Sequence, residues 1–464
     1  MHDIEALKDT KLLTINESWY ADGVSIDTRK PTSNMLFFAI KGEHYDGHDF
    51  VKQAIDNGAV GAVINKVYEK KIQGYENKAL FVYVNDTIQS LGELALIIRK
   101  RYKPTTITIT GSNGKTTTKE ILYEFLSTTY PTGKTLGNFN NLIGLPLSML
   151  NMSQDKKIWV LELGTSRFGE LANLSKIACP DIGILTNIGR AHIEFFKDIE
   201  GVARAKSEMF SVMEPDKVAI VNADDPYALN IVKSFKGKVL TAGFYPSASL
   251  SILSYNLLRG GMEFEIMYEG KRYKFSTQLS GKHYLYDIAL AILCARHLNV
   301  EWENIKSVCK DFKPFKGRGN AITYKNGVVL IDDTYNANPD SMINGFLSAI
   351  ERYGARNIIA VIGDMFELGQ QTTIEHYNLG QFLAKQGINK FILIGKFSES
   401  TLEGIKSTGR KDIYVKQVND TQSAVQELLY LSDEKAVIYV KGSRAMRLEE
   451  VISNYDYMMR QKNA

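Results

Sequence analysis

Short apolar runs alternate with amphipathic segments along nearly the whole chain. Runs rich in Val, Ile, Leu or Phe predict buried strands, and apolar residues three or four positions apart predict the helices between them. The strand candidates are residues 35–40, 59–64, 79–84, 105–110, 158–163, 182–187, 217–222, 328–333, 357–363, 390–395 and 436–442. This alternation favours an α/β fold with mainly parallel sheets covered by helices.

Three interruptions divide this pattern. Pro104 follows the helical segment LGELALIIRKRY, and KDFKPFKGRGN (310–320) breaks a second helical stretch with Pro, Gly and basic residues. Between them, LSILSY, MEFEIMY and KRYKFSTQL are separated by RGG and EG, which predicts an antiparallel excursion over 249–279. We predict three domains: a small α/β domain (1–103), a central domain with a mainly parallel sheet plus this excursion (104–313), and a C-terminal Rossmann-like domain (314–464).

Composition and charge exclude several classes of protein. The 464 residues, 44% of them hydrophobic, are enough for about three domains. The charged N-terminus is unlike a secretory signal and no apolar run reaches the roughly 18 residues that span a bilayer, so we expect a cytoplasmic protein without membrane insertion. A net charge of +4 from 56 basic and 52 acidic residues predicts no nucleic-acid partner. Cys179, Cys294 and Cys309 have no metal-ligand spacing.

ITGSNGKTTTKE (109–120) lies between a strand pattern and a helical pattern, as a phosphate-binding loop would. The strict Walker pattern fails because Ile109 stands where its first glycine belongs. Gly111 and Gly114 still allow close backbone approach, Lys115 supplies positive charge, and Thr116 offers a hydroxyl to Mg²⁺. An ordinary glycine turn is the alternative, but the flanking strand and helix favour ATP and magnesium.

Two further residues are candidate metal ligands. Glu162 ends the run IWVLEL, and a carboxylate at a strand end suits a hard cation, although a loop-facing carboxylate is the plainer interpretation. His192 follows the run IGILTN, and a lone histidine is more often structural. Neither residue carries the prediction alone.

Several motifs in order resemble the Mur ligase family, ATP-dependent enzymes that build the peptide stem of bacterial peptidoglycan. Residues 25–50 are similar to a UDP-binding domain that two members share, and the C-terminal motifs resemble the member that adds D-alanyl-D-alanine to a UDP-linked tripeptide. The motifs are SIDTRKPTSNMLFFAIKGEHYDGHDF (25–50), TGSNGKTTTKE (110–120), GNFNNLIGLP (137–146), NIGRAHIEFF (187–196), GVARAKSEMF (201–210), IDDTYNANPDSM (331–342), GDMFELG (363–369) and VKGSRAMRLEE (440–450).

The resemblance implies a ligase that moves the γ-phosphate of ATP to the tripeptide carboxylate, after which an amine attacks the acyl phosphate. The expected partners are UDP-N-acetylmuramoyl-tripeptide and D-alanyl-D-alanine, and we expect a monomer. The alternatives are an amino-acid-adding member of the family, folylpolyglutamate synthase, and a non-catalytic nucleotide-dependent binding protein. IDDTYNANPDSM argues against the first two. The third is disfavoured by the intact set Lys115, Glu162, His192, Lys206 and Arg318.

The resemblance also implies residue roles. Lys115, His192, Lys206 and Arg318 are expected to be catalytic. Two Mg²⁺ ions are expected on Thr116, Glu162, His192 and Lys206. Contacts to ATP are expected from Gly111, Ser112, Asn113, Gly114, Lys115, Thr116, Thr117, Asn141, Asn222, His283, Asp287, Arg318 and Asp333. Substrate contacts are expected from Thr28, Arg29, Lys41, Gly42, Asp46, Gly47, His48, Tyr335, Asn336, Asn338 and Ser341.

Some of these residues have plainer interpretations. The family carries a carbamylated lysine at Lys206, and carbamylation needs a neutral amine, so we expect surroundings that disfavour its ammonium form. Unmodified, it would be a solvated helix residue. Likewise, His48 could be a turn residue, Arg318 a solvated linker residue and Tyr335 a packing aromatic, while Asp333 is expected to receive the ribose or position the linker.

One segment departs from the family pattern. The family reads G-x-H-N-x-x-N-A, with asparagines near the adenine, whereas GKHYLYDIALA (281–291) has Tyr284 and Asp287 at those places. Asn222 in VNADDP is therefore expected to carry more of the contact with the base.

Overall fold

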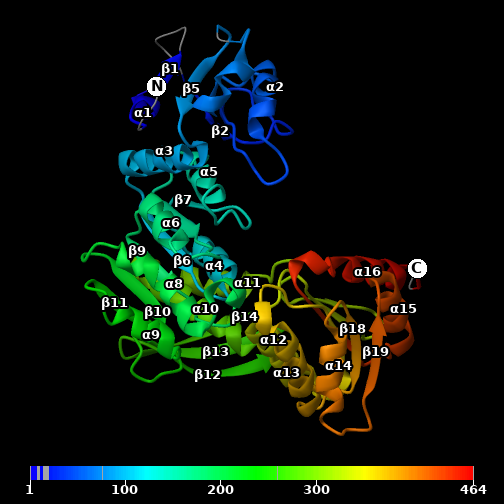
Figure 1. The fold of residues 1–464 in the computed structure, drawn as a ribbon. Coiled ribbons are helices and arrows are strands. Elements are labelled where there is room, and N and C mark those ends of the chain that lie inside the picture. Colours follow the sequence, from blue (N-terminus) through cyan, green and yellow to red (C-terminus); the bar gives the residue numbers. More distant parts are fainter. Residues whose placement is uncertain (1, 8–10, 14–19, 76, 259, 463–464) are drawn as a thin grey trace.

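A computed structural model describes residues 2–7, 11–13, 20–75, 77–258 and 260–462. Within these residues the strands form three sheets, which Figure 1 shows as three lobes, coloured blue, cyan to green, and yellow to red along the chain. Most neighbouring strands run parallel, and one antiparallel excursion extends the middle sheet. The predicted α/β class is confirmed.

The N-terminal sheet has the strand order β1-β5-β4-β3-β2 and is parallel except for β1. It joins the next lobe through α3 and through Asn151, which accepts from the Val24 amide at 2.8 Å and donates to the Val24 carbonyl at 2.9 Å. Its elements are α1 (His2–Glu5), β1 (Lys11–Leu13), β2 (Gly23–Ser25), β3 (Met35–Phe38), η1 (Gly47–Phe50), α2 (Val51–Asp56), β4 (Gly61–Asn65), η2 (Lys66–Ile72), β5 (Leu80–Val84) and α3 (Thr87–Tyr102).

The central sheet has the order β14-β13-β12-β11-β10-β9-β6-β8-β7. Apolar cores cover both of its faces, one with α4, α10 and α11 and the other with α5, α6, α8 and α9. Its elements are β6 (Thr105–Thr110), α4 (Lys115–Ser127), β7 (Thr132–Lys134), α5 (Gly144–Leu150), β8 (Ile158–Glu162), α6 (Glu170–Ala178), β9 (Ile182–Leu185), α7 (Ile193–Phe196), α8 (Ile199–Ser211), β10 (Val218–Asn222), α9 (Pro226–Val232), β11 (Lys238–Gly243), β12 (Leu250–Leu258), β13 (Gly261–Tyr268), β14 (Lys271–Thr277), α10 (Lys282–His297) and α11 (Trp302–Asp311).

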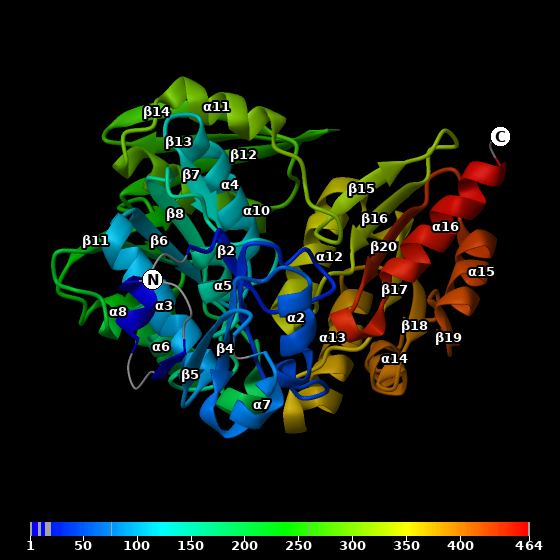
Figure 2. The ribbon, with the colours of Figure 1, turned by 90° about the horizontal axis from the view of Figure 1, so that it is seen from above.

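The C-terminal sheet has the order β15-β16-β20-β17-β18-β19, with only its β15 edge antiparallel among the described strands. Figure 2 shows its strands between α12, α13 and α14 on one side and α15 and α16 on the other. Its elements are β15 (Asn320–Thr323), β16 (Val329–Asp333), α12 (Pro339–Tyr353), η3 (Ala355–Asn357), β17 (Ile358–Ile362), η4 (Gly369–Gln371), α13 (Thr372–Lys385), β18 (Lys390–Ile394), α14 (Ser398–Lys406), β19 (Tyr414–Val418), α15 (Thr421–Leu431), β20 (Val437–Lys441), η5 (Arg444–Met446) and α16 (Glu449–Lys462).

Strand direction brings the predicted site residues together. β6, β8 and β9 are parallel neighbours, so their carboxyl ends lie at one edge of the central sheet. The phosphate-loop candidate follows β6, Glu162 ends β8, and the segment containing His192 follows β9. Among the described helices, none is both long and apolar enough to cross a bilayer.

Candidate active site

The loop after β6 is built around two glycines. A Cβ on Gly111 would lie 1.9 Å from Thr186 Oγ1, and one on Gly114 would lie 2.1 Å from Asp287 Oδ1, with a φ of 81° at Gly114. Only glycine fits either position without moving a neighbour. The Lys115 side chain folds back onto this loop, and its Nζ donates to the Gly111 carbonyl at 2.8 Å.

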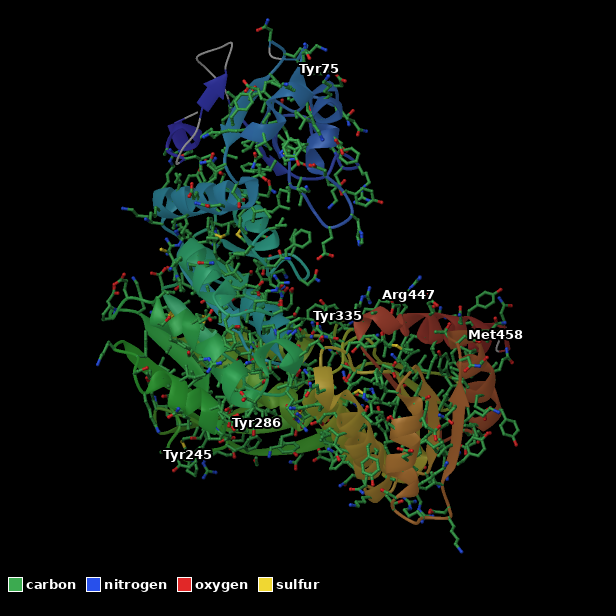
Figure 3. The ribbon with its side chains drawn as sticks, in the orientation of Figure 1. Tyr75, Tyr245, Tyr286, Tyr335, Arg447 and Met458 are labelled. Atoms are coloured by element: carbon green, nitrogen blue, oxygen red, sulfur yellow. The ribbon has the colours of Figure 1, made fainter. Side chains whose placement is uncertain are left out.

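A cavity of about 1030 Å³ lies in front of the loop, and residues of the central and C-terminal sheets both line it. Figure 3 shows Tyr335 at this joint between the two lobes. The predicted residues that line the cavity are Ser112, Asn113, Gly114, Lys115, Thr116, Thr117, Asn141, Glu162, His192, Asn222, His283, Asp287, Arg318, Asp333, Tyr335, Asn336, Asn338 and Ser341. Gly111, Lys206 and the residues predicted in the N-terminal lobe are not part of its wall.

Glu162 is buried at the end of β8, and its two side-chain oxygens have different surroundings. Its Oε1 accepts from Asn140 Nδ2 at 2.9 Å, whereas Oε2 has no hydrogen-bond partner among the described residues. The ammonium of Lys119 lies 3.6 Å from Oε2 and is itself fully buried. Asn141, the residue predicted near the metal, uses its Oδ1 to accept from the Gly144 amide at the start of α5, at 2.8 Å. Asn140 is therefore the asparagine beside Glu162.

His192 faces the C-terminal lobe. Its φ of 56° turns the chain into α7, and its Nδ1 lies 2.6 Å from Glu367 Oε2. This close contact with His192 lowers the pKa of Glu367. This pair connects the predicted metal-ligand segment to the GDMFELG motif.

Lys206 lies inside the protein on α8, with only 2% of its surface exposed. Burial, together with the nearby charge of Lys115, lowers the pKa of Lys206 well below its ordinary value. The predicted surroundings that disfavour an ammonium are therefore present.

The residues predicted near the adenine separate into two places. Asn222 Oδ1 accepts from the Asp224 amide at 2.9 Å, and His283 Nδ1 lies 3.2 Å from Ser348 Oγ. Burial lowers the pKa of His283 to about 4, which keeps the ring neutral. Asp287 instead lies directly against the phosphate loop at Gly114, where its Oδ1 accepts from Thr118 Oγ1 at 3.3 Å.

Arg318 spans the joint between the lobes. Its Nη2 donates to Thr116 Oγ1 at 3.0 Å, and its guanidinium lies 4.1 Å from the centre of the Tyr335 ring. Asp332, rather than Asp333, holds the linker, because Asp332 Oδ2 accepts from the Gly317 amide at 3.0 Å.

Asp333 lies beside a buried lysine that the motifs did not single out. Its Oδ2 pairs with Lys441 Nζ at 2.7 Å and accepts from the Tyr439 hydroxyl at 2.8 Å. Lys441 also donates to the Asn336 carbonyl at 3.0 Å.

Asn338 and Ser341 form a capping box at the start of α12. The Asn338 side chain accepts from the Ser341 amide at 2.8 Å, and the Ser341 hydroxyl accepts from the Asn338 amide at 3.0 Å. Asn338 Nδ2 also donates to Asn113 Oδ1 at 2.8 Å, so the C-terminal helix contacts the phosphate loop directly.

A cluster that the motifs did not reveal also joins the two lobes. The Arg190 guanidinium donates to Asp340 at 2.6 and 3.0 Å and to Glu375 at 2.9 and 3.2 Å. The Arg190 amide also donates to Asp340 Oδ2 at 2.6 Å. NIGRAH contains Arg190 and NANPD contains Asp340, but nothing in their spacing pairs them, and Glu375 lies outside both motifs.

The residues predicted to hold the nucleotide sugar lie around one edge of the N-terminal sheet. Thr28 Oγ1 donates to Gln53 Oε1 at 3.2 Å, and the exposed Arg29 pairs with Asp27 at 2.9 Å. Lys41 and Asp46 form an isolated bridge, and the Gly42 amide donates to the Tyr45 carbonyl at 2.8 Å inside it.

Gly47 and His48 begin the η1 turn, and His48 is used within the lobe. A Cβ on Gly47 would lie 2.6 Å from the Ile40 amide nitrogen, so the two segments pack backbone to backbone. His48 Nδ1 lies 2.6 Å from Asp46 Oδ1, and its Nε2 accepts from the Asn65 amide at 3.0 Å. Both ring nitrogens therefore have protein partners.

Family models match three parts of the chain, each in the lobe described above. They are the Mur ligase family, catalytic domain (residues 21–98), the Mur ligase middle domain (109–295), and the Mur ligase, glutamate ligase domain (317–444). A Bacillus subtilis (strain 168) relative named UDP-N-acetylmuramoyl-tripeptide--D-alanyl-D-alanine ligase is 32% identical over 452 residues, 97% of this chain and 96% of that protein. The chain belongs to the Mur ligase family. An Escherichia coli (strain K12) ligase of the same name is 32% identical over 93% of each chain.

Solved structures of the Mur ligase family share the whole fold. MurF from Acinetobacter baumannii has a TM-score of 0.87 at 28% identity and covers 98% of both chains. MurF from Thermotoga maritima, solved in complex with ADP, has a TM-score of 0.83 at 28% identity over 95% of this chain and 98% of that one. The predicted family is confirmed, and these relatives bear the name of the member that the C-terminal motifs resemble.

Proposed function

We propose that this Mur ligase joins D-alanyl-D-alanine to UDP-N-acetylmuramoyl-tripeptide in an ATP-dependent reaction, acting as a monomer. The observation that carries the proposal is the shared cavity, in which Lys115, Glu162 and Arg318 face one space between two lobes. The names of the relatives at about 30% identity over nearly the whole chain supply the substrates.

The phosphate loop suits the first half of the reaction. The loop amides and the N-terminus of α4 would hold the phosphates, and Lys115 Nζ would exchange its loop carbonyls for phosphate oxygens. The tripeptide carboxylate attacks the γ-phosphorus and ADP leaves, which gives an acyl phosphate. Phosphoryl transfer depends mainly on such positioning and charge neutralisation.

The residues present also fit Mg²⁺. Glu162 Oε2 is buried without a hydrogen-bond partner among the described residues, and the Thr116 hydroxyl faces the same cavity. Among the described residues there is no cluster of three or more His, Cys, Asp or Glu that could hold a metal alone. We therefore assign the ion to Glu162 and Thr116 together with phosphate oxygens, where it would offset the charge of the transferring group.

Lys206 and His192 are proposed to hold a second Mg²⁺. The lowered pKa of Lys206 favours the neutral amine that reacts with CO₂, and the resulting carbamate would replace a cation with an anionic oxygen ligand. The pairing of His192 with Glu367 fixes its ring at the joint, where the C-terminal lobe approaches.

The C-terminal lobe would bind the second substrate, D-alanyl-D-alanine. Arg318 is proposed to turn from Thr116 to the γ-phosphate, and Tyr335, Asn336, Asn338 and Ser341 line the part of the cavity left for D-alanyl-D-alanine. Its amine attacks the acyl carbon and expels phosphate, in a joint that limits access of water. Thr28, Arg29, Lys41, Gly42, Asp46 and Gly47 are proposed to hold the UDP-sugar; His48 is left out, because its ring bonds within the lobe.

Phosphate release measured with each substrate omitted in turn tests this proposal. We expect release only when ATP, Mg²⁺, UDP-tripeptide and D-alanyl-D-alanine are all present, with the UDP-pentapeptide identified by mass. A single amino acid that replaces the dipeptide at equal rate would favour an amino-acid-adding enzyme. Release independent of both peptides would contradict the proposal.

A further inference from the structure

The first turn of α10 makes a hydrogen bond to the linker that carries Arg318. The Tyr284 hydroxyl donates to the Arg318 carbonyl at 2.7 Å, and the tyrosine is 8% exposed. Burial raises the pKa of Tyr284, so the hydroxyl keeps the proton that it donates. This bond connects the central lobe to the backbone of Arg318.

The C-terminal lobe holds the residue before it. The Gly317 amide donates to Asp332 Oδ2 at 3.0 Å, and the Gly317 carbonyl accepts from the Tyr335 amide at 3.0 Å. Gly319, with a φ of 71°, follows directly, and a Cβ there would lie 2.8 Å from the Tyr284 hydroxyl. The linker is therefore tied on one side to β16 and on the other to α10.

The same helix turn also supports the phosphate loop. Asp287, three residues after Tyr284, accepts from Thr118 Oγ1 at 3.3 Å and packs against Gly114. The guanidinium of Arg318 donates to Thr116 in that loop at 3.0 Å. One helix thus contacts the backbone of Arg318 and, through Gly114 and Thr118, the segment that carries Thr116.

We propose that Tyr284 is a positioning residue that sets the reach of Arg318 toward the phosphate loop. Its hydroxyl fixes the position of the Arg318 peptide, so the guanidinium is already oriented toward the transferring phosphate and needs no reordering during the reaction. The family pattern has an asparagine at this position, and its side chain is too short to reach as far as the Tyr284 hydroxyl. The hydrogen bond to the Arg318 carbonyl therefore depends on the tyrosine that this chain carries at 284. The inference rests on the proposed ligase function.

A double-mutant cycle in the full-length enzyme tests the proposal. We expect Tyr284→Phe to lower kcat by about tenfold, the worth of one buried hydrogen bond, with the KM for ATP within about twofold of wild type. In an Arg318→Ala background the same change should lower kcat by less than about twofold, because Tyr284 then has no guanidinium to position.

Tyr130→Phe is the matched control. The Tyr130 hydroxyl donates to the Leu298 carbonyl at 2.8 Å, which is the same kind of bond at the opposite end of α10, about 20 Å away along the helix. We expect this variant to keep wild-type kcat and to show a change in melting temperature similar to that of Tyr284→Phe.

The outcomes distinguish the role of Tyr284 from the ligase function on which it depends. If the wild type ligates and Tyr284→Phe keeps full kcat, or if its loss is equal in the two backgrounds, Tyr284 is only structural and this inference is overturned. If the wild type forms no UDP-pentapeptide from ATP, the proposed function itself fails.

Discussion

Asp287 places a carboxyl group where ionisation is disfavoured. It is 4% exposed against the phosphate loop, and its hydrogen bond from the Thr118 hydroxyl is long, at 3.3 Å. Burial raises the pKa of Asp287 from 3.8 to about 8, so the folded protein keeps this group protonated at neutral pH. We predict that Asp287→Asn changes how stability depends on pH.

The sign follows from the raised pKa. Between pH 3.8 and about 8 the folded state binds a proton that the unfolded state releases, so the free energy of unfolding falls as pH rises. The slope is about 1.4 kcal/mol per pH unit. Asparagine holds no such proton. From pH 5 to pH 8 the variant should therefore gain about 4 kcal/mol relative to the wild type.

Unfolding in urea or by heat at pH 5.0, 6.5 and 8.0, without nucleotide, measures this difference. Asp216→Asn is the control, because it makes the same Asp-to-Asn exchange at a side chain that is 73% exposed. We expect the Asp287→Asn advantage to grow steadily toward pH 8 and the control to follow the wild type. A constant gap across this range, or one that grows toward acid, would show that Asp287 is not protonated in the folded protein.

Three further predictions concern the joint and the metal ligands. Arg190→Ala removes the hydrogen bonds to Asp340 and Glu375, so the contact between the central and C-terminal lobes should be weakened by about 1–2 kcal/mol. Small-angle scattering should then show a larger radius of gyration, and an unchanged radius of gyration would contradict this. Glu162→Gln should lower kcat/KM by at least about 100-fold and raise the Mg²⁺ concentration needed for half-maximal rate; an unchanged Mg²⁺ requirement would show that Glu162 holds no ion. Lys206→Ala should be inactive and regain activity with short carboxylic acids, whereas full activity without them would exclude the carbamate.

The fold could be predicted where strands are buried on both faces. IWVLE in β8 and IIAVI in β17 are buried at every position, so the sequence shows them as continuous apolar runs. β19, at the edge of its sheet, has the sequence YVKQV with mostly exposed or half-buried residues, and β7 is the short segment TGK. β19 carries no apolar signal because most of its positions are exposed or half-buried, and β7 carries none because it has only three residues, Thr, Gly and Lys.

The site could be predicted where one local motif holds the chemistry. The phosphate loop, Glu162 and His192 each follow a recognisable strand, and the structure brings them to one edge. Spacing could not decide between neighbours: Asn140 rather than Asn141 contacts Glu162, and Asp332 rather than Asp333 holds the linker. A one-residue shift reverses which way a side chain points, and only the folded loop determines it.

The sequence motifs could not predict which residues contact each other between lobes. Asn113 meets Asn338 across 225 positions, and Arg190 meets Glu375 across 185. No periodicity links such residues, because their proximity depends on how two separately folded sheets dock. Lys441 was missed for a different reason: its partner Asp333 lies opposite it on the neighbouring strand β16 of the same sheet, and strands 108 positions apart in the sequence show no sign of being neighbours.

The fate of the tripeptide's carboxylate oxygen shows whether the ligase forms an acyl phosphate. UDP-tripeptide labelled with ¹⁸O in its terminal carboxylate is incubated with ATP, Mg²⁺ and D-alanyl-D-alanine, and the released phosphate is analysed by mass spectrometry. An acyl phosphate predicts one ¹⁸O in each phosphate released and one retained in the new amide. Unlabelled phosphate, or equal product formation without ATP, would contradict the account.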